Sequence, residues 1–258
     1  MPELPEAQSN LGRVREGALN RTVRAITLGE TSHVDLPSEA ERDRLVGHRF
    51  TETRRHGKTL FVGSASGPWL AIHLGMTGSL RVYDEGDAPD YARLTVEFEG
   101  DRRLAFRCPR KLGSVELVED PETYVAEQGY GPDALDIDED SFADTIGTSD
   151  GALKSALMDQ KKLAGLGNLW SDETLFQSGH DPEAAGSDLT DGQLSDLHAT
   201  MRAVLQGVLD TGANYEDLPG TWLIHRREDG AQCPRCPGTI RKRQVGGRSA
   251  HACDQHQG

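Results

Sequence analysis

Residues 153–178 read LKSALMDQKKLAGLGNLWSDETLFQS, which is the most informative stretch of the chain for its fold. Apolar residues recur at helical spacing over 153–163, which predicts one helix. Gly165 and Gly167 then favour a turn, because glycine adopts backbone conformations that end a helix. A second helix is expected over 169–178. This stretch therefore predicts two helices joined by a glycine-rich turn.

A further helical pattern follows this pair. Thr190 and Gln193 form a capping-box sequence, and an apolar stripe over 194–208 follows it, which predicts a long helix. We expect a helical domain at 129–230 and a small cysteine module at 231–258.

Residues 1–128 have the pattern of short strands after one N-terminal helix. The helix is expected because Pro2 suits a first helical turn and because Leu11 and Val14 mark one apolar face. Strands are expected at 23–28, 59–63, 69–74, 79–83, 93–98, 103–107 and 114–118. Many short strands with turns predict a β-sandwich or barrel, so the fold class is α+β: an N-terminal β-sandwich with flanking helices and a C-terminal helical domain.

The net charge of -14 argues at first against a polyanionic partner. However, twelve acidic and no basic residues lie within 116–150, a segment that we interpret as the link between the two parts. The basic residues cluster at 54–58, 102–111 and 235–248, so a cationic face is compatible with an acidic protein. Excess acid with only six lysines also suggests a cytoplasm of high salt content.

The length of 258 residues allows one large or two ordinary domains. No apolar run is long enough for a membrane helix, and the N-terminus shows no secretory signal. We expect a soluble, cytoplasmic monomer without a membrane partner.

The C-terminal module contains two pairs of metal-ligand residues. Cys233 and Cys236 form one pair, and Cys253 and His256 form the other, each with two intervening residues. This spacing predicts one tetrahedral Zn²⁺, which is structural because four protein ligands leave no position for water. The alternative is three free cysteines with a chance histidine.

A basic hairpin is expected between these pairs. The sequence RKRQVGGRS at 241–249 has Gly246-Gly247 at its turn and carries cationic side chains, including Arg248. Such a hairpin on a rigid metal anchor is suited to phosphate contacts. The alternative for these charges is a solvated face.

Several segments occur in the order found in the formamidopyrimidine-DNA glycosylase and endonuclease VIII family, which the chain resembles from end to end. The segments are PELPE at 2–6, HLGMTGSLR at 73–81, PRKLG at 109–113, LMDQKKLAGLGNLWSDETLF at 157–176, and the terminal cysteine knuckles. The resemblance implies a bifunctional base-excision repair enzyme that removes an oxidised base from damaged double-stranded DNA and then nicks the strand by β,δ-elimination.

The resemblance also implies catalytic residues. Removal of Met1 would free the secondary amine of Pro2, the nucleophile that forms an iminium with the sugar. Glu3 would protonate the sugar ring oxygen. Lys58 would contact phosphate and assist elimination, while Glu6 and Glu173 would support the nucleophile and the catalytic pocket.

By the same resemblance, the stretch at 150–182 is a helix-two-turn-helix element, in which Asn168 contacts the phosphate beside the lesion. Lys154 and Arg248 match further phosphate contacts, and the backbone amides of the turn attract phosphate themselves.

Met76, Arg110 and Leu112 match the side chains that fill the space of the everted nucleotide. Leu112 stands where many members have phenylalanine, and leucine can still act as a wedge between bases.

Two alternatives stay open at this point. HLGMTGSLR points to oxidised purines, whereas the short segment NYEDLPGT at 214–221 and the following IHRREDG permit oxidised pyrimidines. The alternative to an enzyme is a non-catalytic, zinc-containing DNA-binding protein that kept the fold, while a zinc hydrolase is disfavoured by the closed ligand set.

Overall fold

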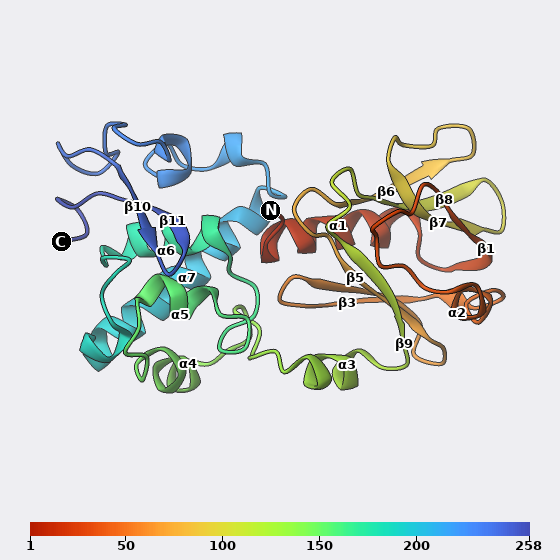
Figure 1. Cartoon of the computed structure of the whole chain (residues 1–258), viewed down its shortest axis with the longest axis horizontal. Coiled ribbons are helices and arrows are strands. Elements are labelled where there is room, and N and C mark those ends of the chain that lie inside the picture. Colours follow the sequence, from red (N-terminus) through yellow and green to blue (C-terminus); the bar gives the residue numbers. More distant parts are fainter. The chain divides into compact units, whose positions relative to one another are not determined.

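The computed structural model describes all 258 residues, which divide into two compact units (Figure 1). The first unit comprises Met1–Pro2 and Glu6–Gly129, and the second comprises Glu3–Pro5 and Tyr130–Gly258. Helix α1 spans Leu4–Gly17, so its first two residues belong to the second unit.

The first unit contains two antiparallel sheets and two short helices. The five-stranded sheet has the order β2-β1-β7-β8-β6, with β1 at Arg21–Leu28, β2 at Arg49–Phe50, β6 at Ser79–Asp84, β7 at Ala92–Phe98 and β8 at Arg102–Arg107. The four-stranded sheet has the order β3-β4-β5-β9, with β3 at Glu52–His56, β4 at Thr59–Gly63, β5 at Trp69–His73 and β9 at Ser114–Val118. The short helices are α2 at Glu39–Asp43 and α3 at Pro121–Gln128.

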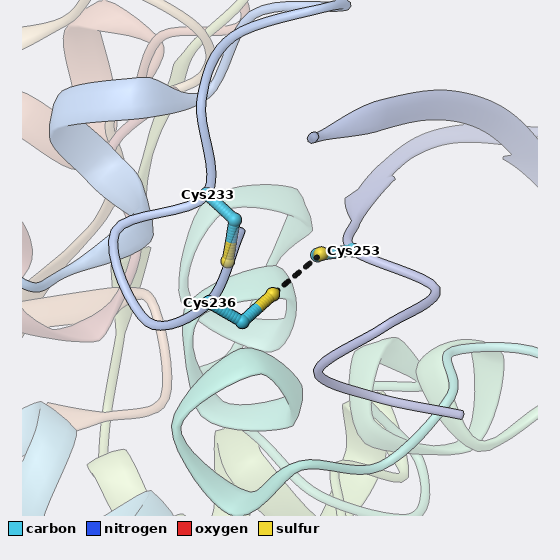
Figure 2. Close-up of side chains that lie close together, drawn as sticks. All are labelled: Cys233, Cys236 and Cys253. Atoms are coloured by element: carbon cyan, nitrogen blue, oxygen red, sulfur yellow. Dashed lines mark hydrogen bonds between the residues drawn. The ribbon is translucent and has the colours of Figure 1, made fainter. Parts of the chain in front are cut away.

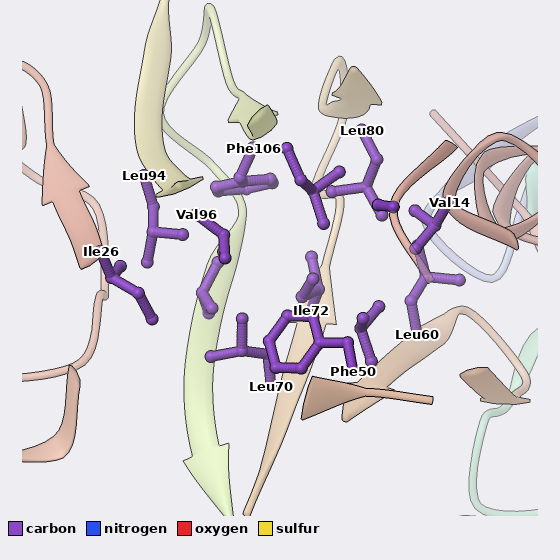
Figure 3. Packing of buried hydrophobic residues seen from close by; sticks show 14 of the residues in the cluster. Val14, Ile26, Phe50, Leu60, Leu70, Ile72, Leu80, Leu94, Val96 and Phe106 are labelled. Carbon is purple, nitrogen blue, oxygen red and sulfur yellow. The ribbon is translucent and has the colours of Figure 1, made fainter. Parts of the chain in front are cut away.

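The core of the first unit is formed by the apolar faces of both sheets and of α1 (Figure 3). Leu94, Val96 and Phe98 are buried, as their alternation with polar residues predicts. Val14 of α1 is fully buried in the same cluster. The predicted N-terminal β-sandwich with a flanking helix is confirmed.

Strand β3 was not predicted from the sequence, and its composition explains why. It is an edge strand of sequence ETRRH, and all five of its residues keep some exposure. An edge strand of this kind lacks the apolar alternation that identifies a half-buried strand.

The acidic segment at 116–150 contains two helices and is not simply a link, which corrects the sequence interpretation. Asp120 accepts a hydrogen bond from the N–H of Thr123 at the start of α3. Asp138 does the same for Ser141 at the start of α4, Glu139–Ile146. Acidic residues therefore cap helices here, because a carboxylate satisfies the free N–H groups of a first turn.

The second unit is built from helices around one apolar core. Besides α4 it contains α5 at Leu153–Met158, α6 at Asn168–Ser178, α7 at Asp191–Asp210 and the 3₁₀ turns η1 at Gly186–Asp188, η2 at Tyr215–Asp217 and η3 at Leu223–Arg226. The helix predicted over 153–163 ends at Met158, because Asp159 is extended and its carbonyl accepts the N–H groups of Lys162 and Leu163 in a turn. No helix of the protein combines the length and the apolar character that crossing a bilayer requires.

The basic hairpin forms as predicted. Strand β10, Arg241–Val245, pairs antiparallel with β11, Arg248–Ala252. Gly246 and Gly247 have φ angles of 55° and 75°, a left-handed pair that fits a two-residue hairpin turn.

We predict that Thr190→Ala lowers the free energy of unfolding by about 1 kcal/mol, because the side chain caps α7 by accepting the N–H of Gln193. Urea denaturation measures the change. Thr200→Ala, in the middle of the same helix, is the matched control and should not destabilise the protein. Equal effects of the two substitutions would contradict the capping role.

Candidate functional site

The carboxylate of Glu3 is buried at the N-terminus of α6. Its side chain is 2% exposed and accepts hydrogen bonds from the N–H groups of Gly167, Leu169 and Trp170 at 2.7, 2.8 and 3.1 Å. The first N–H groups of a helix have no partners within it, and they carry partial positive charge. Glu3 therefore caps α6 from a distant position in the sequence.

Gly167 is required for this arrangement. A Cβ atom at this position would lie 2.5 Å from both Cδ and Oε1 of Glu3. The N–H of Leu4 also donates to the carbonyl of Gly165 at 3.1 Å. We predicted that the backbone amides of this turn attract phosphate. In the structure they donate to the Glu3 carboxylate instead, so these N–H groups are already occupied.

Asn168 is the first residue of α6 and is partly exposed. Its backbone carbonyl accepts a hydrogen bond from Arg227 at 3.1 Å. Its side-chain oxygen is buried without a partner. The position suits the predicted phosphate contact, which would come from the side-chain amide, since neighbouring backbone N–H groups are engaged.

Asp172 organises a buried ion cluster behind this turn. Its carboxylate contacts the ammonium of Lys154 at 2.5 Å and the guanidinium of Arg227 at 2.7 Å, and it accepts the backbone N–H of His251 at 3.1 Å. Lys154 also donates to the carbonyl of Ser249 at 2.6 Å. These bonds attach β11 and the segment before the hairpin to α6.

Lys154 is consequently fully buried, and the phosphate contact predicted for it requires the ion cluster to open. Burial lowers the pKa of Lys154, while the charge of Asp172 opposes this effect. Sequence reasoning did not identify Asp172 or Arg227. A single aspartate in a helix gives no signal of the distant cations that neutralise it.

Glu173 is 1% exposed and accepts N–H groups from the segment after α7. The donors are Leu223 at 3.0 Å and Ile224 at 2.8 Å, together with the side-chain amide of Gln177 at 2.7 Å. Burial raises the pKa of Glu173, and these hydrogen bonds act against that shift. The residue thus fixes η3 onto α6.

In the first unit, Pro2, Glu6 and Lys58 are all partly exposed. Glu6 lies in the first turn of α1, and Lys58 lies in the turn between β3 and β4.

His73 pairs across the strands with Thr59, the residue after Lys58. Burial lowers the pKa of His73 and the Lys58 charge lowers it further, so the two side chains are close. His73 lies within the motif HLGMTGSLR, but sequence reasoning did not single it out.

Met76 and Leu112 are 40% and 54% exposed, which is unusual for large apolar side chains. They lie on adjoining loops, because a Cβ at Gly75 would be 2.2 Å from the carbonyl oxygen of Leu112. Arg110 is exposed on the second loop. The structure therefore brings together the three residues predicted to fill the space of an everted nucleotide.

The loop with Arg110 and Leu112 is tied to the sandwich by Lys111. The ammonium of Lys111 contacts Glu30 at 2.6 Å and lowers the pKa of that carboxyl to about 2. Lys111 itself has a φ angle of 55°.

Cys233, Cys236 and Cys253 form a cluster whose sulfur atoms all lie within 4.8 Å of one another (Figure 2). Cys236 accepts the backbone N–H of Gly238 at 3.3 Å, which lowers the pKa of its thiol, and Cys233 accepts the N–H of Arg235 at 3.4 Å. Three converging sulfurs fit a Zn²⁺ site.

The converging group comprises the three cysteines, and the predicted fourth ligand, His256, lies outside it. Its Nε2 atom bonds to the carbonyl of Phe176 at 2.8 Å, and the two rings pack with centroids 4.7 Å apart. Because a carbonyl can only accept, Nε2 carries the proton and Nδ1 has the free lone pair.

Of the cationic hairpin residues, Arg241, Lys242 and Arg248 are exposed. Arg243 instead pairs with Asp181 and Glu183 at 3.2 and 3.1 Å. Arg248 lies beside the turn, opposite Val245.

Two family models match the chain. Residues 1–115 match the formamidopyrimidine-DNA glycosylase N-terminal domain, and residues 129–217 match the formamidopyrimidine-DNA glycosylase H2TH domain. The chain is 33% identical over 272 residues to the formamidopyrimidine-DNA glycosylase of Geobacter metallireducens and 32% identical over 275 residues to that of a Roseiflexus strain, with 100% of both proteins covered in each case.

Solved structures are similar over almost the whole chain. The Lactococcus lactis formamidopyrimidine-DNA glycosylase, bound non-covalently to DNA containing an AP site, superimposes with a TM-score of 0.86 at 27% identity over 99% of both chains. MutM in complex with DNA containing carbocyclic 8-oxo-G superimposes with a TM-score of 0.87 at 26% identity over 100% of both chains.

We predict that Gly167→Ala destabilises the protein by about 1–3 kcal/mol, because the added methyl group overlaps the Glu3 carboxylate. The same substitution should cost less in a Glu3→Ala background, where the overlap is gone. Urea denaturation of the single and double variants gives the coupling. Gly192→Ala is the control, since a Cβ there meets nothing within 4 Å. Additive effects of Gly167→Ala and Glu3→Ala would refute direct contact.

Proposed function

Because the chain belongs to the formamidopyrimidine-DNA glycosylase family, we propose that it removes oxidised bases from double-stranded DNA and cleaves the resulting abasic site. The observation that carries this proposal is the buried Glu3 carboxylate next to Pro2 at the start of the chain. A protein that only binds DNA has no need of a terminal amine beside an oriented carboxylate.

Base removal starts from the neutral secondary amine of Pro2, exposed once Met1 is removed. Its nitrogen attacks C1′ of the damaged nucleotide, and the bond from C1′ to the base breaks with the electron pair leaving on the base. As the nitrogen bonds to C1′, the proton it carries passes to the Glu3 carboxylate, while the departing base takes a proton from water. Glu3 then delivers that proton to the sugar ring oxygen as the bond from C1′ to this oxygen breaks, which leaves an iminium between Pro2 and C1′. The three N–H groups at the start of α6 orient the Glu3 carboxyl group for this step.

Strand cleavage follows from the iminium. The positive nitrogen acidifies the C2′ hydrogen, so loss of that proton expels the 3′ phosphate, and a second elimination expels the 5′ phosphate. Lys58, whose side chain is close to His73, supplies the cation that assists departure of a phosphate. Hydrolysis of the remaining iminium frees Pro2. Glu6 and Glu173 support this machinery, Glu173 by holding η3 in place.

DNA contacts are divided among several elements. Met76 and Leu112 act as apolar wedges, and Arg110 faces the unpaired base opposite the lesion. Asn168 and Arg248 contact phosphates, for which their exposure and location are suitable. Lys154 contributes a direct contact only if it leaves Asp172.

We assign oxidised purines as the substrate class. Relatives named as formamidopyrimidine-DNA glycosylases match the whole chain, and similar structures were solved with DNA containing Fapy-dG or carbocyclic 8-oxo-G. Oxidised pyrimidines are the alternative, supported by the short segment that includes η2 and η3.

One structural Zn²⁺ is held by Cys233, Cys236 and Cys253, with Nδ1 of His256 as the fourth ligand. A histidine ligand commonly donates its other ring N–H to a backbone carbonyl, and Nε2 of His256 has such a carbonyl partner in Phe176. The ion would brace the hairpin that carries Arg248, because a module of this size has little apolar core of its own.

We predict that borohydride traps a covalent adduct between the protein and an abasic duplex, and that peptide mapping locates it on Pro2. Pro2→Gly should slow adduct formation by about 10²-fold, because a flexible primary amine is poorly positioned. Pro5→Ala, a substitution of the proline in the first turn of α1, is the control and should retain the wild-type rate. An adduct on any other residue would contradict the assigned nucleophile.

The same assay separates the alternatives. Faster trapping on a duplex with an oxidised guanine than on one with an oxidised pyrimidine supports the purine assignment, and the reverse order overturns it. Tight binding to the abasic duplex without any adduct identifies a non-catalytic DNA-binding protein.

We predict one zinc ion per chain in the purified protein, released on thiol modification and lost in Cys233→Ala. His256→Ala should weaken zinc binding at least about tenfold. In the Co²⁺-substituted protein, His256→Cys should change the visible spectrum from that of a three-sulfur, one-nitrogen site to that of a four-sulfur site. An unchanged spectrum would exclude His256 as a ligand.

A further inference from the structure

Two arginines without acidic partners lie side by side on the first unit. Helix α1 runs along β6, because Asn10 accepts the N–H of Leu80 at 2.7 Å and a Cβ at Gly17 would meet Val82 at 2.7 Å. Arg13 lies one helical turn after Asn10, and Arg81 follows Leu80 directly. Burial lowers the pKa of Arg13, and the charge of Arg81 lowers it further, as expected for neighbouring cations.

A third arginine continues this row on the next strand. Ser79 of β6 pairs with Arg107 of β8, so Arg107 and Arg81 project from the same face of the sheet, the face opposite Leu80 and Phe106 of the core. Their positions are diagonal neighbours, roughly 7–8 Å apart. We call Arg13, Arg81 and Arg107 the arginine row; its strands and helix can be followed in Figure 1.

None of the three has a carboxylate within ion-pair distance or a hydrogen-bond partner, and Arg107 contacts only the ring of Tyr91, 5.4 Å away. Most other arginines of this sheet are neutralised. Arg24 pairs with Glu97 at 2.7 Å, and Arg102 pairs with Asp84 at 3.2 Å. On a chain with a net charge of -14, three adjacent unpaired cations mark a surface suited to an external anion.

The arginine row begins at the loops that carry the proposed wedges. Arg107 is the last residue of β8 and leads into the loop with Arg110 and Leu112. Ser79 opens β6 directly after the loop with Met76. When these loops hold DNA, the backbone phosphates next to the lesion therefore lie near one end of the arginine row.

We propose that the arginine row binds backbone phosphates of the DNA flanking the lesion, guiding the duplex over the outer face of the five-stranded sheet. The inference rests on the proposed function. Guanidinium groups bind phosphate through paired N–H donors, and a row of them follows a strand without reading its sequence. The contacts extend the footprint beyond the nucleotides that the catalytic groups reach.

The test compares two triple variants of the full-length protein. Arg13→Gln/Arg81→Gln/Arg107→Gln removes the row, and Arg24→Gln/Arg44→Gln/Arg102→Gln removes three arginines of the same unit that have carboxylate partners. Both changes alter net charge equally. Fluorescence anisotropy measures binding across a salt series to a duplex with an uncleavable abasic analogue, in a short form ending near the lesion and a form extended on both sides.

On the extended duplex, loss of the row should reduce the slope of log affinity against log salt by about 2–3, since each phosphate contact contributes about 0.9. The short duplex and the control variant should keep wild-type slopes. An unchanged slope, or equal losses on both duplexes, overturns the proposal. Borohydride trapping on a short duplex with a true abasic site is measured in parallel, so failure of the proposed function is seen as absence of adduct in every variant.

Discussion

The interaction on which the second unit and its chemistry depend is the hydrogen bonding of the Glu3 carboxylate to the first N–H groups of α6. A buried carboxylate is costly unless it is fully hydrogen-bonded, and a helix N-terminus supplies donors with the right charge. The same bonds restrict the position of Pro2, because Pro2 is covalently attached to Glu3 as the preceding residue. Gly167 makes the approach possible, since no larger residue leaves room for the carboxylate.

Helix α6 also binds other distant segments of the second unit along its length. After Glu3 at its N-terminus, Asp172 binds Lys154, Arg227 and the backbone of β11, while Glu173 holds η3, and the carbonyl of Phe176 receives His256. Four distant segments are thus fixed by consecutive turns of one buried helix. The partners are charged or backbone groups in the interior. Leaving one of them without its hydrogen bond therefore lowers the free energy of unfolding more than the loss of a surface hydrogen bond would. The proposed catalytic acid, hairpin and metal module share this one support.

The charge distribution reconciles an acidic chain with a polyanionic partner. Carboxylates cap helices at Asp120 and Asp138 and pair with several arginines of the sandwich, such as Arg24 and Arg102. Cations without acidic partners include Arg241, Lys242 and Arg248 of the hairpin, Arg110 of its loop and the arginine row. At physiological salt, interactions between exposed charges are largely screened beyond about 8 Å. Contacts with phosphates therefore depend on the nearby side-chain charges and not on the net charge of the chain.

The amino-acid sequence alone determined the α+β class, most strands of the sandwich, the helical pair around the glycine-rich turn, the hairpin and the three clustered cysteines, because these depend on local periodicity, turn residues and fixed spacing. Edge strand β3 and helices α3 and α4 were not predicted, since these short segments are mostly polar, and α4 offers only Phe142 and Ile146 as a buried apolar pair. The tertiary structure decided which charges meet. It buried Lys154 against Asp172, bonded the turn amides to Glu3, and paired Nε2 of His256 with the carbonyl of Phe176. Such partners are far apart in the chain, and only the folded backbone brings them within hydrogen-bonding distance.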